Sequence, residues 1–294
     1  MDILISGLNN YVGRRSASLM ADERFRVFAI TRNFKLFESR LFEPLHAQVF
    51  EVDLIRGGID PEFFIPNLQA AFYFTQVPTL LDMVNLKLEL LSLRNFIHLL
   101  KRMNCQRIVY VARLVDRSGI QLILDLLKEM RMDYTVVLKN SVLGKDSLLD
   151  RVFKSIAERR FILYAKKYAD RSFQPLGIHD FIRWLKAILQ VPAFHHRILE
   201  VGGSETISFM ELFDFYRSFH LIRSGQQIVH VPRWLVKFMY SRKLDISATD
   251  YAELTRVIQS DYHVNNTWQV EMPFAFSSIQ DTLLDGRENH LLRA

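Results

Sequence analysis

Short apolar runs alternate with helical patterns along the first half of the chain. The runs lack polar alternation, which is typical of strands buried on both faces of a parallel sheet. Between them lie segments with apolar residues near helical spacing, of which the longest extends from Leu80 to Met103. The runs predict buried strands at Ile3–Ile5, Arg26–Ile30, Val49–Leu54, Ala70–Phe74, Arg107–Val111 and Tyr134–Leu138.

This series of strand–helix units predicts an α/β fold with a doubly wound parallel sheet of the Rossmann type. Crossovers in such a sheet are nearly always right-handed, although one sequence does not give the strand order. After about residue 145 the alternation becomes irregular, and the clearest later strand is Arg197–Val201. We therefore expect a Rossmann domain over residues 1–145 and a smaller α/β part over residues 146–294, packed on the carboxyl edge of the sheet.

Cysteine usage and the N-terminal segment bear on the cellular compartment. Cys105 is the single cysteine among 294 residues, so one chain forms neither a disulfide framework nor a cysteine-based metal site. This usage fits a reducing compartment. We expect a strand rather than a signal peptide at Met1–Ser6, because a basic region and a long apolar run are lacking. No run approaches the roughly 18 apolar residues of a membrane span, and we expect a cytoplasmic protein.

The formal net charge of +6 favours acidic or anionic partners but does not indicate a fold. From Asp150 to Arg171 seven basic residues accompany three acidic ones. This stretch is either a solvated helix face or a site for an anionic ligand or an acidic protein partner. It lacks the spaced aromatics and glycines of an RNA-binding sheet, so we expect no nucleic-acid partner. Its basic residues are Arg151, Lys154, Arg159, Arg160, Lys166, Lys167 and Arg171.

The first predicted strand ends in a loop with the frame Gly-x-x-Gly-x-x-Gly, in which Asn10 replaces the central glycine. In this frame one glycine makes a tight turn, one lets the backbone approach a pyrophosphate, and one allows close packing of helix on strand. The following helix offers N–H groups and a positive dipole to phosphates. Gly7 and Gly13 keep the outer positions, and asparagine adopts positive φ more readily than most residues. The loop predicts either a dinucleotide site or a turn that no longer binds one.

Polar residues also follow the second and third predicted strands. Arg32 and Asn33 follow the second strand, and an arginine there suits the 2′-phosphate of NADP. NAD-selective folds place an acidic residue at this position instead. Asp53 and Leu54 end the third predicted strand, where the carboxylate either faces an adenine ring or caps a turn. If a dinucleotide binds, NADP(H) is therefore favoured over NAD(H), and the alternative is that no cofactor binds.

These segments together resemble the atypical short-chain dehydrogenases of the NmrA-like and complex I 39-kDa-subunit-like group. The resemblance rests on Ile3–Arg15, Arg32-Asn33, Asp53-Leu54, Arg107–Arg113 and Glu200–Leu212, and it extends over most of the chain. It implies a dinucleotide bound along the first four strand ends. The binding positions that it implies are Gly7, Asn10, Tyr11, Val12, Gly13, Arg14, Arg32, Asn33, Asp53, Leu54, Thr75, Gln76 and Val77.

The chain departs from this family at its catalytic pair. Classical members carry Tyr-x-x-x-Lys on the helix after the fifth strand and Ser or Thr at the end of that strand. The lysine lowers the pKa of the tyrosine for proton exchange. The corresponding segment, Ser118–Lys128, contains no tyrosine, and the strand before it ends in Ala112-Arg113. We therefore assign no catalytic residue. We assign no metal site either, because no cysteine or carboxylate spacing supports the adjacent His195 and His196.

Three functions remain open on this evidence. The first is an NADP(H)-binding protein without catalysis, which acts as a sensor, an assembly factor or a subunit. The second is an NADPH-dependent reductase whose acid is an unrecognised residue or the substrate itself. The third is a scaffold in which Asn10 has abolished nucleotide binding.

Overall fold

The computed structural model of the chain describes residues 1–39, 41, 45–56, 60, 62–223, 225–232, 248–259 and 261–284. The chain divides into two compact units, and each is made of separate segments. The first unit comprises Met1–Lys139, Phe181–Glu200 and Asn266–Phe274. The second comprises Asn140–Asp180, Val201–Asn265 and Ala275–Ala294. The division expected at residue 145 and the packing of the later part on the sheet edge stay predictions.

The first unit is built on a sheet. Its strands are β1 Asp2–Ser6, β2 Arg26–Thr31, β3 Gln48–Glu51, β4 Leu68–Phe74, β5 Arg107–Arg113, β6 Asp133–Lys139 and β11 Arg197–Val201. Their order is β11-β6-β5-β4-β1-β2-β3, and every pair from β6 to β3 is parallel. This order confirms the predicted doubly wound α/β sheet.

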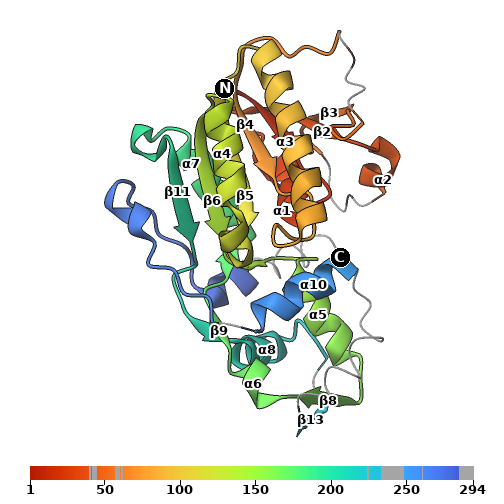
Figure 1. The fold of residues 1–294 in the computed structure, drawn as a ribbon. Helices are drawn as coiled ribbons and strands as arrows, with labels where there is room; N and C mark the ends of the chain where they lie inside the picture. Colours follow the sequence, from red (N-terminus) through yellow and green to blue (C-terminus); the bar gives the residue numbers. More distant parts are fainter. Residues whose placement is uncertain are drawn as a thin grey trace. The chain divides into compact units, whose positions relative to one another are not determined.

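Helices lie on both faces of this sheet. They are α1 Tyr11–Leu19, α2 Phe34–Glu38, α3 Met83–Arg102, α4 Gln121–Glu129 and α7 Ile178–Ile188, with short 3₁₀ turns η1 Leu114–Gly119, η2 Pro192–Phe194 and η3 Thr267–Val270. The chain leaves β1 toward β2 but leaves β4 in the opposite direction, toward β5. Right-handed crossovers therefore place α1 and α3 on opposite faces, and Figure 1 shows α3 beside α4 in front of the sheet. At such a reversal of strand order the carboxyl ends of the strands open a crevice for a ligand.

The turn from β1 into α1 depends on two glycines. Gly7 has φ +90°, and a Cβ atom there would overlap the carbonyl oxygen of Phe74 at the end of β4. A Cβ atom on Gly13 would lie 2.5 Å from the carbonyl oxygen of Gly7. The absence of both side chains lets the loop pass close to β4 and lets α1 begin directly against it.

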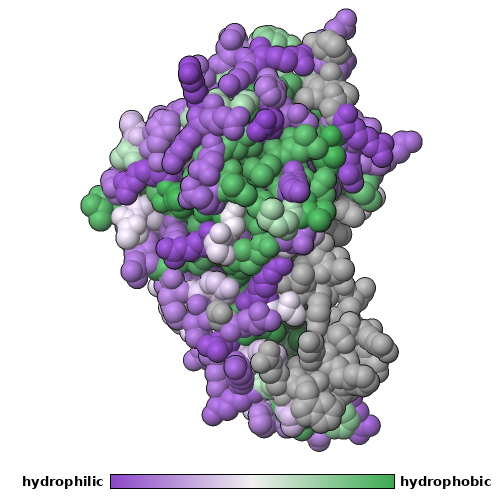
Figure 2. All heavy atoms as spheres, in the orientation of Figure 1, coloured by the Kyte–Doolittle hydropathy of each residue, from purple (hydrophilic) through white to green (hydrophobic). Residues whose placement is uncertain are grey.

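Helix α3 carries two apolar stripes with different surroundings. Leu86, Leu93 and Phe96 on its inner side are buried against the sheet. On its outer side Val84 and Leu91 are exposed, and Figure 2 shows apolar side chains gathered on the surface over α3 and α4. The apolar spacing that predicts the helix therefore continues partly on a face that the described residues leave open to solvent.

Two predicted boundaries and one helix implied by the resemblance differ from the structure for local reasons. The helix expected from Leu80 begins at Met83, because Asp82 accepts a hydrogen bond from the Asn85 N–H and caps it. The strand expected to Leu54 ends at Glu51, where the chain turns. The segment Ser118–Lys128, which corresponds to one helix in the family that the chain resembles, is divided between the 3₁₀ turn η1 and α4.

The second unit combines short strands with helices. Its strands are β7 Val142–Leu143, β8 Phe161–Tyr164, β9 Ser172–Phe173, β10 Leu176–Gly177, β12 Ile207–Ser208 and β13 Gln227–His230. Its helices are α5 Leu148–Ala157, α6 Lys166–Ala169, α8 Phe209–Ser218 and α10 Ala248–Val257. β7 with β10 and β8 with β13 are parallel, whereas β9 with β12 is antiparallel. Across the described parts of both units, every helix is too short or too polar to cross a bilayer.

Replacing Gly7 by alanine should destabilise the chain by about 3 kcal/mol, because strain at positive φ adds to the overlap with Phe74. The measurement is equilibrium unfolding in urea. Gly225→Ala is the matched control, since Gly225 has φ +100° but no heavy atom of the described residues lies within 4 Å of the added Cβ. The free energy of unfolding of the Gly225→Ala variant should fall by only about 1 kcal/mol. Equal losses for the two variants would contradict the close approach of the loop to β4.

Candidate functional site

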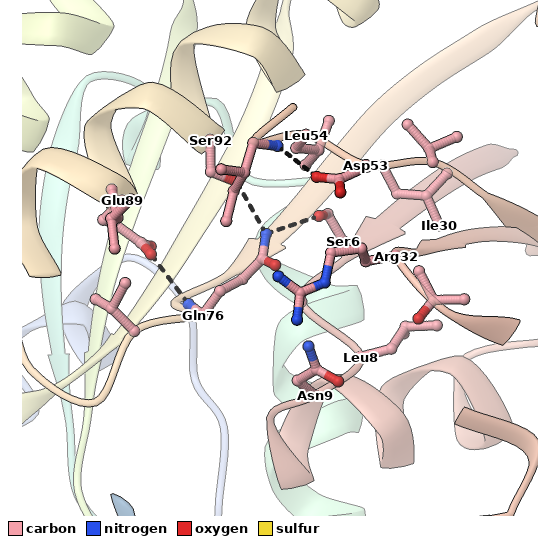
Figure 3. A pocket seen from close by; sticks show the side chains of 16 residues that line it. Ser6, Leu8, Asn9, Ile30, Arg32, Asp53, Leu54, Gln76, Glu89 and Ser92 are labelled. Carbon is pink, nitrogen blue, oxygen red and sulfur yellow. Dashed lines mark hydrogen bonds between the residues drawn. The ribbon is translucent and has the colours of Figure 1, made fainter. Parts of the chain in front are cut away.

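A cavity of about 140 Å³ opens in the first unit where the strand order reverses. Its walls come from the residues at the carboxyl ends of β1, β2, β3 and β4, and from one side of α3 (Figure 3). This is the crevice at which ligands bind in open α/β sheets. The lining consists of Ser6, Gly7, Leu8, Asn9, Ile30, Thr31, Arg32, Val52, Asp53, Leu54, Ile55, Gln76, Val77, Leu88, Glu89 and Ser92.

Asn10 does not use the positive φ that the sequence suggested. Its φ is −77° and its ψ is 139°, and it is the N-cap of α1. The side-chain oxygen accepts a hydrogen bond of 2.9 Å from the Val12 N–H, while the amide donates to the Thr75 carbonyl at 3.3 Å. The expected turn forms without a positive φ at Asn10, because the Asn10 side chain bonds to the start of the helix. One N–H group at the helix N-terminus is thus satisfied by the protein itself.

Arg14 also turns back onto the loop. Its guanidinium donates to the Asn9 carbonyl at 2.9 Å and to the Leu8 carbonyl at 3.4 Å. These two contacts hold the cation beside the loop. Together with the Asn10 cap they give the loop a fixed set of internal hydrogen bonds.

Arg32 is the cation that points into the cavity. Its side chain is exposed, and Figure 3 shows the guanidinium directed toward Gln76 and Asn9. Arg32 has no acidic or hydrogen-bonding partner within the part of the chain that the structure describes. Asn33, the next residue, is the N-cap of α2 and accepts a hydrogen bond from the Leu36 N–H at 2.9 Å. Arg32 is therefore available to an anion, whereas Asn33 has a structural bond.

The wall formed after β3 is both polar and apolar. Asp53 Oδ1 accepts hydrogen bonds from the N–H groups of Ile55 and Arg56 at 2.9 and 3.1 Å, so the carboxylate caps a turn. The exposed side chains of Ile55 and Leu88 both line the cavity. Two apolar side chains at the rim suit a flat heteroaromatic ring, because covering it removes apolar surface from water.

Glu89 is a buried acid in the cavity wall that the sequence analysis missed. It is 0% exposed, and its carboxylate oxygens accept from the Tyr110 hydroxyl at 3.0 Å and from the Gln76 N–H at 3.2 Å. Burial raises its pKa from 4.5 to about 7, although these hydrogen bonds and the charge of Arg113 lower it in part. A signal was present in the sequence, since Glu89 lies at a helical step from Leu86 on the buried stripe of α3.

Gln76 links the cavity wall to the sheet. Its side-chain amide donates to the Tyr73 and Ser92 hydroxyls at 3.2 Å and to the Ser6 hydroxyl at 3.4 Å. The Tyr73 hydroxyl itself donates to Ser92 at 2.9 Å. These bonds tie β1, β4 and α3 together at the base of the cavity.

A buried ion pair occupies the end of β5, where the family resemblance would place a catalytic hydroxyl. Arg113 Nη2 lies 2.6 Å from Asp116 Oδ2, and their side chains are 7% and 0% exposed. Arg113 also donates to the Val77 carbonyl at 3.1 Å. Asp116 Oδ1 accepts from the Leu80 N–H at 3.1 Å and from the Thr79 hydroxyl at 3.2 Å. The pair therefore bonds the end of β5 to the loop that follows β4.

The other predicted positions divide into two groups. Gly7, Arg32, Asp53, Leu54, Gln76 and Val77 line the cavity. The remaining predicted positions are outside the cavity lining. They lie at the start of α1, at the N-cap of α2 and just after β4, and they are Asn10, Tyr11, Val12, Gly13, Arg14, Asn33 and Thr75. Thr75 is buried and donates to the Val111 carbonyl at 3.0 Å, which links β4 to β5.

The histidine pair lies away from this cavity. His195 Nδ1 is 3.0 Å and His196 Nε2 is 4.0 Å from Asp133 Oδ1, a carboxylate that sequence spacing did not reveal. Arg107 Nη1 lies 3.4 Å from the same oxygen. Among the described residues, no group of three or more histidine, cysteine or acidic side chains is arranged to hold a metal ion.

Solved structures match this chain over nearly its whole length. A triphenylmethane reductase from Citrobacter sp., solved with NADP(H), is 11% identical with a TM-score of 0.65, and the match covers 97% of this chain and 100% of that one. A nucleoside-diphosphate-sugar epimerase from Staphylococcus aureus is 13% identical with a TM-score of 0.64, over 96% and 99%. A UDP-glucuronic acid 4-epimerase from Bacillus cereus, solved with NAD, is 13% identical with a TM-score of 0.60, over 88% and 97%.

The chain shares their fold. No protein-family model matches the sequence, and no curated protein matches it either. The predicted resemblance to NAD(P)-dependent short-chain dehydrogenase-type proteins is thus confirmed at the level of the fold. What the cavity of this chain binds has to be argued from its own residues.

The buried Glu89 should make stability depend on pH. Its folded pKa of about 7 exceeds the ordinary value of 4.5, so between these values the folded state holds a proton that the unfolded state releases. The free energy of unfolding should therefore fall by about 3 kcal/mol as the pH rises from 4.5 to 7, and then stay level. Urea unfolding across this range should show a flatter profile for Glu89→Gln. Glu62→Gln, at an exposed position, is the control, and a Glu89→Gln profile that matches wild type would refute the assignment.

Proposed function

We propose that this chain binds NADP(H) in the cavity and does so without catalysing hydride transfer, as a sensor, an assembly factor or a subunit. The observation that carries the proposal is Arg32, an exposed guanidinium that points into the cavity and has no acidic partner within the described residues. A guanidinium binds a phosphate with two parallel hydrogen bonds, which suits the 2′-phosphate of NADP.

The residues present fit the adenosine side of a dinucleotide. Ile55 and Leu88 offer apolar surface to the adenine ring, and Arg32 offers positive charge to the 2′-phosphate. Gly7 has no side chain, so the backbone of its loop can approach the ligand closely. The nicotinamide carries the hydride chemistry of such a dinucleotide, and in this proposal the chain does not use it. The fold likeness to proteins solved with NADP(H) or NAD supports a nicotinamide dinucleotide as the ligand.

The absence of catalysis is supported at the end of β5. Arg113 and Asp116 are buried and bonded to each other there, and the segment from Leu114 to Glu129 contains no tyrosine. A general acid must reach the reacting atom and exchange a proton with it. The Arg113–Asp116 pair meets neither condition, because its polar atoms bond to each other and to the loop after β4.

A sensor or subunit also needs a surface for its partner. Within the basic stretch Lys154 pairs with Asp150 and Arg171 pairs with Asp261, so part of the charge is neutralised. Lys166 and Lys167 of α6 are exposed and have no acidic partner among the described residues. We place the contact with an acidic protein there, and we assign the protein to the cytoplasm, whose reducing conditions suit the buried thiol of Cys105.

NADPH should stabilise the purified chain against heat more than NADH does. A ligand at about 100 times its Kd raises the free energy of unfolding by about 2.7 kcal/mol, which corresponds to a rise in Tm of roughly 5 °C. Arg32→Ala should weaken NADPH binding about 10-fold to 100-fold, because a charge-assisted hydrogen-bonded pair is lost. Arg24→Ala, at another exposed arginine of the same unit, is the control and should bind as wild type does. The absence of a shift with both nucleotides would refute the proposal, and equal shifts would refute the preference for NADP(H).

The chain should not consume NADPH in the presence of carbonyl, quinone or imine substrates. The physical reason is that the described residues at the end of β5 offer no group placed to exchange a proton with a substrate. The measurement is the absorbance of NADPH over hours at a high protein concentration. Substrate-dependent oxidation that disappears in Arg32→Ala would show that the chain is a reductase and would overturn the non-catalytic part of the proposal.

A further inference from the structure

The second unit holds a two-stranded parallel ribbon, formed by β8 and β13 (Figure 1). Within the described parts of the chain these two strands pair with no third strand. Parallel strands usually belong to larger sheets, and an isolated pair of strands is only marginally stable in water. A further strand would therefore stabilise this ribbon.

The backbone groups of β13 point alternately toward β8 and away from it. The N–H groups of Gln227 and Val231 donate to the carbonyl oxygens of the residue before β8 and of its last residue, at 3.4 and 2.9 Å. Because successive N–H groups of a strand point to opposite sides, those of Ile228 and His230 point away from β8. They have no hydrogen-bond partner among the described residues. The outer edge of β13 is thus open to another extended chain.

One face of the ribbon is apolar and open to solvent. Phe161 pairs with Gln227 and Leu163 pairs with Val229, so these four side chains lie on the same face. Phe161 is 47% exposed and Val229 is 39% exposed. A strand added beside β13 would cover Val229 from water if it carried apolar side chains on this face.

Basic residues lie on both sides of the ribbon strands in the sequence. The segments 159–167 and 221–232, which contain β8 and β13, carry five lysines and arginines and no acidic residue. Arg160 precedes β8 and Lys166 and Lys167 follow it, and all three are exposed. This charge favours a partner segment that is acidic.

From these observations we infer that the outer edge of β13 binds an extended, acidic segment of a partner protein as a third strand. The N–H groups of Ile228 and His230 bond to the backbone of that segment. Its apolar side chains, which alternate with carboxylates, cover Val229. The inference rests on the acidic partner in the proposed function and names the form in which that partner binds, and it does not depend on nucleotide binding.

Fluorescence anisotropy of the full chain with labelled peptides of about seven residues tests this inference. A peptide in which glutamate and valine alternate should bind with a Kd of roughly 100 µM or less. A peptide of the same composition with its valines grouped together should bind at least tenfold more weakly, and so should one with lysine in place of glutamate. Equal affinities for the alternating and grouped peptides, or no binding at millimolar concentration, would overturn the inference. The nucleotide part of the proposed function would stand, because the thermal shift with NADPH tests it separately.

Two variants test the edge itself. Ile228→Pro removes an outward N–H group and keeps the N–H groups that bond to β8, so it should weaken binding of the alternating peptide at least tenfold. Val229→Ser keeps the whole backbone and should weaken binding about threefold or more. Val270→Ser, at a valine of the first unit that is 87% exposed, is the matched control and should bind as wild type does. Equal affinities for Val229→Ser and Val270→Ser would overturn the inference.

Hydrogen exchange followed by mass spectrometry gives a readout on the wild-type chain. The backbone amides of residues 225–232 should exchange at least threefold more slowly when the alternating peptide is bound, because a third strand occupies the outward N–H groups. Unchanged exchange over this segment, with the peptide bound, would show that the peptide is held elsewhere by charge alone and would overturn the inference.

Discussion

The close passage of the β1 loop over the end of β4 is the constraint on which the rest of the first unit depends. Because Gly7 has no side chain, its backbone lies against the Phe74 carbonyl, and α1 begins within van der Waals contact of the same turn. This contact lies at the reversal of strand order between β1 and β4. The cavity opens at the same reversal, where α1 and α3 leave the sheet on opposite faces.

The cavity combines two kinds of charge with opposite environments. Arg32 is exposed and directed into the space, whereas Glu89 is fully buried behind it and is held by Tyr110 and the Gln76 N–H. Burial favours the neutral form of Glu89, so the wall adds little negative charge beside the guanidinium at moderately acidic pH. The described lining also holds the carboxylate of Asp53, which two backbone N–H groups bond, and the Arg32 guanidinium is the group in it that suits an anion.

The sequence was sufficient to predict the strands of the sheet, but it predicted only some of the residues that line the cavity. Apolar runs such as Ile3–Ile5 predict buried strands because every side chain there is covered, yet their order depends on pairing between distant segments. Gly7 and Arg32 could be predicted because strand ends meet at one edge of a parallel sheet. Glu89 could not, because α3 reaches the cavity through tertiary packing. The φ of Asn10 could not be predicted either, because it depends on the hydrogen bond by which the Asn10 side chain caps α1.

The buried pair at the end of β5 has a consequence for how such a protein can change over generations. Removing Arg113 or Asp116 alone leaves a charge without its partner in the interior, which costs about 3–5 kcal/mol. That loss is a large share of the stability of an ordinary domain. A lineage that carries this pair therefore reaches a hydroxyl-bearing β5 end only by two simultaneous substitutions or after a stabilising change elsewhere. The ion pair therefore makes single substitutions toward a hydroxyl at this position costly in stability.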